Sequence, residues 1–380
     1  MAAVTRPPAL DRSIRQPARG LRVLTLLVCC CVPVLLTLER LISAARAGDF
    51  AVDFHYHYWA SGHAVLHGQS PLPPATPEAV FMHHAYPAGP YPAPVAVLFA
   101  PLGLIPAWLA DVLFTGIVAA SVFLALHLLG VRDWRCYGAV FLWAPVAAGI
   151  QTANLTILLA VGIAAVWRLR HRLFAPALIV GTLVALKLFV WPLVVWLVAT
   201  RRYSAAACSA AVASTITLVS WAIVDFSALP EYPHVARIFA RYYETSAYTP
   251  FALLLKLGFS AGPARAASLL VGVVAIAAVF VAARRKGGEP ASFTLALAAA
   301  LLWTPIAWLH YFTLLIVPLA LFGADFSPLW LLPAILWMCP AGAPPSAAWE
   351  FALPFVISAL TLFALSRPRN LSVIPASLTS

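Results

Sequence analysis

The chain has 380 residues, of which 63% are hydrophobic and only 10% are charged, and its mean hydropathy is +0.91. Soluble domains carry about 25% charged residues, so this composition excludes an ordinary soluble protein and indicates an integral membrane protein. The net charge of +11 would suit nucleic acid, but the Arg and Lys residues lie in short clusters between apolar runs, as in cytoplasmic loops. We therefore expect no nucleic-acid partner. The apolar runs are long and do not alternate with polar residues, which predicts an all-α polytopic membrane protein.

The N-terminal part combines a basic segment with the first apolar run. Residues 1–21 are predicted to form a cytoplasmic tail, and residues 22–42 a first membrane helix. Ala45-Arg46-Ala47 resembles the cleavage site of a signal peptide. The apolar run at 24–38 ends well before that site, so we predict an uncleaved helix.

A first external loop is predicted at 43–90, and acids, imidazoles and aromatics crowd together in its part 49–68. Asp53 lies at the centre of this stretch, with Asp49 as a nearby competitor. A carboxylate at this point is either a solvated loop acid or a catalytic base that accepts a proton from a substrate hydroxyl. Aromatic side chains that could line a sugar site or anchor a helix at the interface follow it: Tyr56, Tyr58 and Trp59.

The same loop holds six of the ten histidines: His55, His57, His63, His67, His83 and His84. The i,i+4 spacing of His63 and His67 would suit a zinc or manganese ion. No standard metal signature is present, so we favour interfacial hydrogen bonding or substrate contact and expect no cofactor.

The middle of the chain is predicted to contain broken helices. Residues 92–108 are interrupted by Pro94, Pro101 and Pro106, and residues 109–130 form a full span. The apolar segments 138–167 and 173–200 both begin and end at basic clusters, so each is predicted to be two short helices that meet inside or near the outer leaflet. Polar residues interrupt them at Gln151, Asn154 and Lys187.

These polar residues have competing interpretations. Gln151 and Asn154 could line a cavity or hydrogen-bond between helices. Lys187 lies 15 residues after Arg172 and 14 before Arg201, too far to reach the inner surface easily. An intramembrane lysine is a functional candidate, and an anionic phosphate is its natural partner.

The remaining segments complete a single membrane domain at 22–366. Residues 204–224 cross outward, and 225–262 form a second external stretch with a short helix near 249–258 and two exposed cations, Arg237 and Arg241. The later apolar segments are 264–283, 291–309, 311–323, 327–340 and 349–366, with His310 at the outer end of the second of these. Residues 367–380 are predicted to be a cytoplasmic tail. The total is roughly 10–13 transmembrane or re-entrant helices.

Five motifs in sequence order resemble those of bacterial polytopic mannosyltransferases that use polyprenyl-phosphate-mannose, the GT-C-type glycosyltransferases of family 87. They are Asp53-Phe54 with Tyr58-Trp59-Ala60 and 64–71; Tyr91-Pro92-Ala93-Pro94 before Pro101-Leu102; Gln151 with Asn154; Lys187 with Pro192; and Thr304-Pro305-Ile306-Ala307-Trp308-Leu309-His310-Tyr311. The resemblance spans most of the chain.

The resemblance implies a GT-C-like glycosyltransferase of the plasma membrane, with its active site on the extracytoplasmic side and both termini in the cytoplasm. The donor would be a polyprenyl-phosphate sugar, most simply mannose, and the acceptor a glycolipid, lipoglycan or polysaccharide. Asp53 would be the base, and His310 a second catalytic residue. The expected substrate-binding residues are Lys187, Gln151, Asn154, His55, Tyr58, Arg237, Arg241 and Tyr91.

A polytopic transporter or flippase for lipid-linked sugars is the alternative, because broken helices with polar residues also mark transporters. We see no inverted repeat, and the polar residues gather toward the outside, which favours the enzyme.

Overall fold

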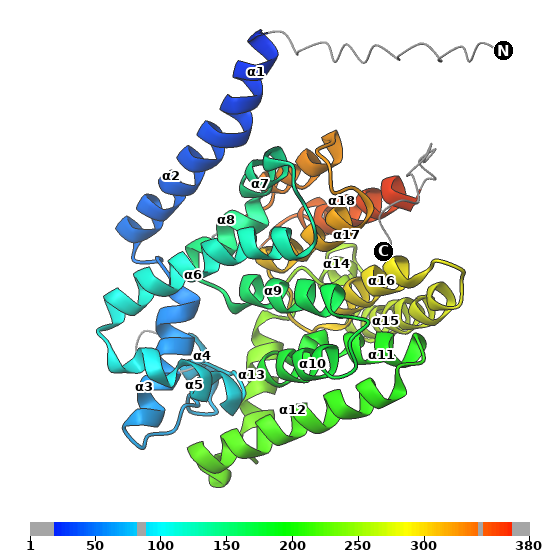
Figure 1. Ribbon diagram of the computed structural model, residues 1–380. Helices are drawn as coiled ribbons and strands as arrows, with labels where there is room; N and C mark the ends of the chain where they lie inside the picture. The colour runs from blue at the N-terminus through cyan, green and yellow to red at the C-terminus, as the bar shows by residue number, and fades with distance from the viewer. Residues whose placement is uncertain (1–18, 82–88, 341–344, 367–380) are drawn as a thin grey trace, which may run out of the picture.

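The computed structural model of the chain describes residues 19–81, 89–340 and 345–366. Within these ranges all regular secondary structure is helical, and the helices form a bundle from which the N-terminal helix projects (Figure 1). The all-α prediction is confirmed. Several predicted features lie outside the described residues: most of the tail at 1–21, His83, His84 and the tail at 367–380.

Four helices in the described part of the chain are long and apolar enough to cross a membrane. They are α1–α2 (Arg19–Leu26 and Val32–Ala47, joined by a π-helical stretch Leu27–Cys31), α6 (Ala107–Leu128), α12 (Tyr203–Val224) and α15 (Ala261–Ala283). A helix of 22 residues is about 33 Å long, enough for a hydrocarbon core about 30 Å thick. These four helices correspond to the spans predicted at 22–42, 109–130, 204–224 and 264–283, and the protein is membrane-embedded.

The break predicted near Gln151 is present. α8 (Ala144–Gln151) and α9 (Leu155–Arg168) meet at 118°. Ala153 adopts φ +51°, in the left-handed region that L residues rarely occupy, and Asn154 caps the start of α9. Strained backbone of this kind tends to occur at functional sites.

The second predicted break is also present. α10 (Ala175–Leu186) ends at Lys187, whose backbone is extended, and a 3₁₀ turn (Leu188–Val190) follows. α11 (Pro192–Ala199) then begins with Pro192 at its first position, where a missing backbone N–H costs nothing.

The stretch expected as the first external loop is largely helical. Phe54–Trp59 is π-helical and continues into α3 (Ala60–Leu66), and α4 (Pro77–Phe81) follows. The proline-interrupted segment forms α5 (Ala93–Phe99) and a 3₁₀ turn (Ala100–Leu104). α3 approaches this segment closely, because a Cβ at Gly62 would lie 2.6 Å from the carbonyl carbon of Phe99.

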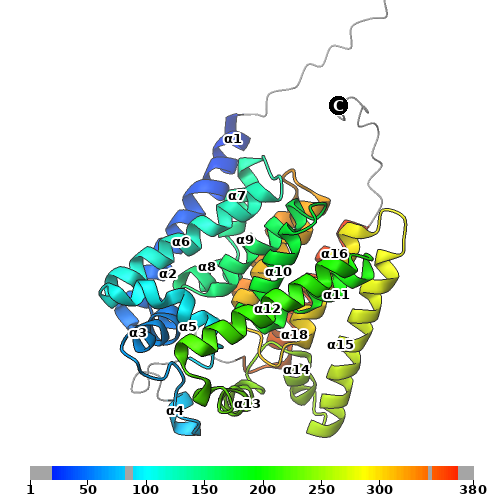
Figure 2. The same ribbon diagram turned by 60° about the horizontal axis from the view of Figure 1, so that its bottom comes forward.

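The second external stretch begins with a 3₁₀ turn (Phe226–Ala228) and contains α13 (Tyr232–Tyr243) and α14 (Pro250–Lys256). α14 corresponds to the short helix predicted near 249–258, whereas α13 was not predicted. α4, α13 and α14 gather at one end of the bundle, and the connection between α15 and α16 (Glu289–Trp303) lies at the other (Figure 2).

The C-terminal part is built from short helices: a 3₁₀ segment Leu309–Leu315, α17 (Ile316–Phe322), a 3₁₀ segment Pro328–Met338 and α18 (Ala348–Ser366). The prediction that a helix runs to His310 was wrong. α16 ends at Trp303, because Pro305 disfavours helical backbone at Thr304, which is extended. His310 therefore lies in the first turn of the next segment and is buried.

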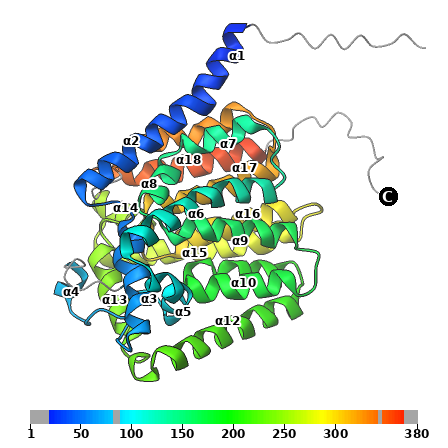
Figure 3. The same ribbon diagram turned by 60° about the vertical axis from the view of Figure 1, so that its left-hand side comes forward.

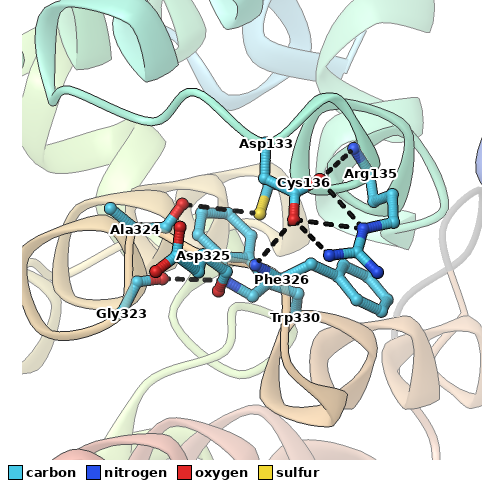
Figure 4. A network of polar contacts seen from close by, with 8 residues as sticks. All are labelled: Asp133, Arg135, Cys136, Gly323, Ala324, Asp325, Phe326 and Trp330. Atoms are coloured by element: carbon cyan, nitrogen blue, oxygen red, sulfur yellow. Dashed lines mark hydrogen bonds and ion pairs between the residues drawn. The ribbon is translucent and has the colours of Figure 1, made fainter. Parts of the chain in front are cut away.

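Two sets of contacts hold these parts together. α9, α10 and α12 run side by side (Figure 3), and a Cβ at Gly181 of α10 would lie 2.6 Å from the Ser209 carbonyl oxygen of α12. At the start of α7 (Trp134–Phe141), the Asp133 carboxylate binds the Arg135 guanidinium at 2.6 Å and accepts from the backbone N–H of Phe326 (Figure 4). The hydrogen bonds from Arg135 lower the pKa of Asp133.

Candidate active site

The segment around Asp53 is docked on the break between α8 and α9 by backbone hydrogen bonds. Ala51 N–H donates to the Gln151 carbonyl at 2.8 Å, and Asp53 N–H donates to the Thr152 carbonyl at 3.1 Å. Ala51 has φ +53°, a second left-handed residue at this junction. Two segments about a hundred positions apart in the sequence are thus joined through their main chains.

Asn154 connects the acid to the helix break. Its Oδ1 accepts from the backbone N–H of Thr156 at 2.8 Å, which caps α9, and its Nδ2 donates to Asp53 Oδ2 at 2.7 Å. Asn154 is only 1% exposed. Because the cap fixes the amide, the side chain holds one carboxylate oxygen of Asp53 in a defined position.

Lys187 lies on the other side of Asn154. Its Nζ donates to Thr156 Oγ1 at 2.8 Å and to Asn154 Oδ1 at 3.4 Å, and lies 4.3 Å from the ring centroid of Tyr311. The side chain is buried, so it does not snorkel to a membrane surface. Among the described residues no carboxylate lies within ion-pair distance of Nζ. A buried ammonium without an anion is costly, and this arrangement suits an anionic ligand.

These groups face a single cavity of about 250 Å³. The polar part of its wall includes Asp53, His57, Asn154 and Lys187. Aromatic and loop residues complete it: Tyr91, Tyr232, Phe239, Tyr243, Thr304, Pro305, Ile306, Trp308 and Tyr311. Aromatic faces beside a carboxylate, an amide and an ammonium form a suitable environment for a sugar carrying an anionic leaving group.

Tyr58 and Gln151 do not line the cavity but hydrogen-bond to the segments that form its wall. The Tyr58 hydroxyl donates to that of Tyr91 at 3.3 Å and accepts from the backbone N–H of Leu155 at 3.4 Å. Burial raises the pKa of Tyr58 well above its usual range, so the phenol stays protonated. Gln151 Nε2 donates to the Asp49 carbonyl at 3.4 Å. The Asp49 side chain is exposed and does not line the cavity.

His55 does not line the cavity and pairs with Asp111 of α6, Nδ1 to Oδ2 at 2.8 Å. This hydrogen bond raises the pKa of His55. The contact fastens the turn after Asp53 to a membrane span. Asp111 was missed from the sequence, although a lone acid inside an apolar span is itself a signal of a specific partner.

His310 is buried beside the helix break, where a Cβ added to Gly149 would lie 3.2 Å from the His310 Cβ. No residue of the described chain offers a hydrogen-bond partner to its Nε2. His310 is not among the residues that line the cavity.

Arg237 and Arg241 lie on α13 but face a second cavity, next to the one that contains Asp53. Sequence reasoning also missed Thr156 and Tyr311, whose roles depend on contacts with Lys187. In the described ranges, no three His, Cys, Asp or Glu side chains converge as metal ligands would.

A family model described as glycosyltransferase family 87 matches residues 90–309, more than half of the chain. The chain belongs to glycosyltransferase family 87. It is therefore a membrane glycosyltransferase, and membership favours the enzyme over a transporter or flippase. The match includes Tyr91, Asn154 and Lys187, whereas Asp53 and His310 lie outside it. The comparisons matched no curated protein and no solved structure.

Proposed function

We propose that this family 87 enzyme transfers a sugar, most simply mannose, from a polyprenyl-phosphate donor to a hydroxyl group of a glycolipid, lipoglycan or polysaccharide acceptor. The transfer would invert the anomeric configuration. The observation that carries the proposal is the chain of contacts Asp53–Asn154–Lys187 on the wall of one cavity. Through these contacts the proposed base, Asp53, and the cation, Lys187, lie at opposite ends of the Asn154 side-chain amide.

In the proposed reaction, the acceptor oxygen attacks the anomeric carbon while Asp53 takes its proton. The bond from the anomeric carbon to the phosphate oxygen breaks, and its electron pair leaves with the polyprenyl phosphate. A positioned base contributes about 10²–10⁴-fold to such a step. The hydrogen bond from Asn154 occupies Asp53 Oδ2 and leaves Oδ1 for the proton.

Lys187 would bind the phosphate and stabilise the negative charge that grows there as the bond breaks. Its two hydrogen bonds to Thr156 and Asn154 leave one of the three ammonium protons for the phosphate. The proposed reaction uses no cofactor, since the lysine supplies the positive charge.

His310 is proposed as a second catalytic group, because its buried Nε2 has no partner among the described residues and the side chain lies beside Gly149 at the helix break. Since His310 does not line the cavity, its contact with the donor would require the wall beside Gly149 to shift when the donor binds. Tyr91 lines the cavity and is proposed to contact the sugar. Tyr58, Gln151 and His55 would instead position the two segments that carry Asp53 and Tyr91.

We further propose that the cavity opens on the extracytoplasmic side of the plasma membrane and that both termini are cytoplasmic. The support is the distribution of charge: the basic clusters at 168–172, 201–202 and 284–286 lie in connections between apolar helices. α4 and α13 gather at the end of the bundle away from the 284–286 connection (Figure 2).

The test is transfer by the purified protein from labelled polyprenyl-phosphate-mannose to a panel of glycolipid acceptors. Asp53→Asn should reduce turnover at least about 100-fold, because it removes the base and keeps the size of the side chain. Asp49→Asn is the matched control and should retain activity, since the Asp49 carboxylate lies outside the cavity. Near-normal transfer by folded Asp53→Asn protein would rule out the assignment.

A further inference from the structure

The end of α3 carries two histidines, His63 and His67, that the proposed reaction does not use. They are one helical turn apart, and their ring centroids are separated by 4.1 Å. Neither side chain lines the Asp53 cavity. His63 is half-buried and His67 is exposed. The i,i+4 spacing did not by itself favour a metal site, but the positions of the ring nitrogens do.

Both histidines are held in the same tautomer. His63 Nδ1 lies 3.0 Å from the Gly103 carbonyl oxygen, and His67 Nδ1 lies 2.8 Å from the carbonyl oxygen of His63. A carbonyl oxygen can only accept a hydrogen bond, so in each ring Nδ1 is the donor and carries the proton. The neutral ring then has its free lone pair on Nε2, which can bind a metal ion. Metal-bound histidines commonly donate their other ring nitrogen to a carbonyl in this way.

The His63 ring is fixed by its neighbours. It stacks on the Trp59 ring, with centroids 4.9 Å apart and planes at 12°. The Trp59 indole donates to the carbonyl oxygens of Leu102 and Ile105 at 3.1 and 3.3 Å. α3 also lies tightly against this turn, because a Cβ at Gly103 would lie 2.9 Å from the His63 Cα. One of the two candidate ligands is therefore held in place before any ion binds, which lowers the entropic cost of binding.

The ligand atoms select the kind of ion. Imidazole suits Cu²⁺, Zn²⁺ and Ni²⁺, whereas Mg²⁺, Ca²⁺ and Mn²⁺ prefer carboxylate, carbonyl and water oxygens. Two nitrogens that bind one zinc ion at about 2.0–2.1 Å lie at most about 4 Å apart, and the two rings are close enough to allow this. Within the part of the chain that the structure describes, no third His, Cys, Asp or Glu joins the pair. Water would complete the coordination, so we expect weaker binding than at a four-ligand structural site.

We propose that His63 and His67 bind one divalent transition metal ion, Cu²⁺ or Zn²⁺, through their two Nε2 atoms. The ion would join His67 to a ring that is itself fastened to Gly103, and so hold the end of α3 against the turn Ala100–Leu104. His63 follows Asp53 by ten residues, roughly 15 Å along a helix, so the ion lies apart from the reacting groups. It stabilises the helix that carries Asp53 and takes no part in sugar transfer.

The first test is metal binding by full-length protein purified without a polyhistidine tag and stripped with a chelator. Calorimetric titrations use Cu²⁺, Zn²⁺ and Mg²⁺, each alone. Cu²⁺ should bind more tightly than Zn²⁺, and Mg²⁺ should not bind measurably. His67→Gln should weaken the Kd for Zn²⁺ about tenfold or more. His234→Gln, an exposed histidine of α13 with no histidine one turn away, is the matched control and should bind like the unaltered protein.

Unchanged Zn²⁺ affinity in His67→Gln would overturn the proposal. An equal loss in His234→Gln would also overturn it, because scattered surface histidines would then account for the binding. Electron paramagnetic resonance of the Cu²⁺ complex should show coupling to two imidazole nitrogens in the unaltered protein and to one in His67→Gln. The same spectrum in both proteins would refute the assignment of the ligands.

The second test is thermal unfolding. A metal that binds only the folded state raises the Tm, so Zn²⁺ should raise the Tm of the unaltered protein and of His234→Gln but not that of His67→Gln. His67 is exposed, so without metal its variant should unfold at the temperature of the unaltered protein. His63→Gln is a second variant that should also lose the shift. An equal Zn²⁺ shift in the His67 or His63 variant would contradict the proposal, whether or not the protein transfers sugar.

Discussion

Replacing Lys187 by Met should separate stability from activity in this enzyme. Burying an ammonium costs several kcal/mol even after the protein relaxes around it. The contacts that offset this cost are one good hydrogen bond to Thr156, a longer one to Asn154 and the face of Tyr311 at 4.3 Å. A charged hydrogen bond contributes about 1.5–3 kcal/mol and a desolvated cation–π contact about 2 kcal/mol, so the sum offsets much of the cost but leaves no large surplus.

Met keeps most of the length of the lysine stem and carries no charge. We therefore expect Lys187→Met to unfold within a few degrees of the unaltered protein or slightly above it. Its kcat should fall about 10²–10³-fold, the usual loss when a group that stabilises developing negative charge is removed. Lys286→Met, an exposed lysine in the loop after α15, is the control and should alter neither quantity.

The assay is thermal unfolding with and without polyprenyl phosphate, together with transfer kinetics. A ligand that binds only the folded state raises its Tm, so polyprenyl phosphate should stabilise the unaltered protein and the Lys286 control but not Lys187→Met. The reasoning is refuted if Lys187→Met retains normal kcat. A large fall in the Tm of Lys187→Met would also refute it if polyprenyl phosphate still raised the Tm of this variant, since the lysine would then be structural.

Two further predictions concern how the Asp53 segment is held. The hydrogen bond to Asp111 raises the pKa of His55, so the charged pair stabilises the folded protein fully at pH values below the ordinary pKa of histidine, and this stabilisation is lost as the pH rises through the raised pKa. The difference in Tm between the unaltered protein and Asp111→Asn should therefore be larger at pH 6 than at pH 9. Equal differences at the two pH values would contradict this. Gly62→Ala would place a Cβ 2.6 Å from the Phe99 backbone, which cannot rotate away, and should cost about 1–3 kcal/mol of stability in thermal unfolding. Gly116→Ala is the control and should cost no stability, because nothing lies within 4 Å of its added Cβ. Equal losses of stability in the two variants would refute the packing argument.

Local sequence signals predicted most of the helices and the places where they break. The spans at α6, α12 and α15 follow from uninterrupted apolar runs, because backbone in lipid must satisfy its own hydrogen bonds. The breaks at Asn154 and Lys187 were found because polar residues interrupt such runs. α13 was missed because many of its residues are polar and only one face of the helix, which lines the Asp53 cavity, is apolar or aromatic.

The sequence by itself determined that the chain is an all-helical membrane protein with polar breaks and a histidine-rich first loop, since composition and hydropathy act locally. Only the tertiary structure decided which of these residues meet. Asp53 and Asn154 are 101 positions apart, and Arg237 resembles Lys187 in charge, yet the fold puts Lys187 beside Asn154 and turns Arg237 to another cavity. The direction of a side chain on a helix is set by what the helix packs against, and no local pattern encodes that partner.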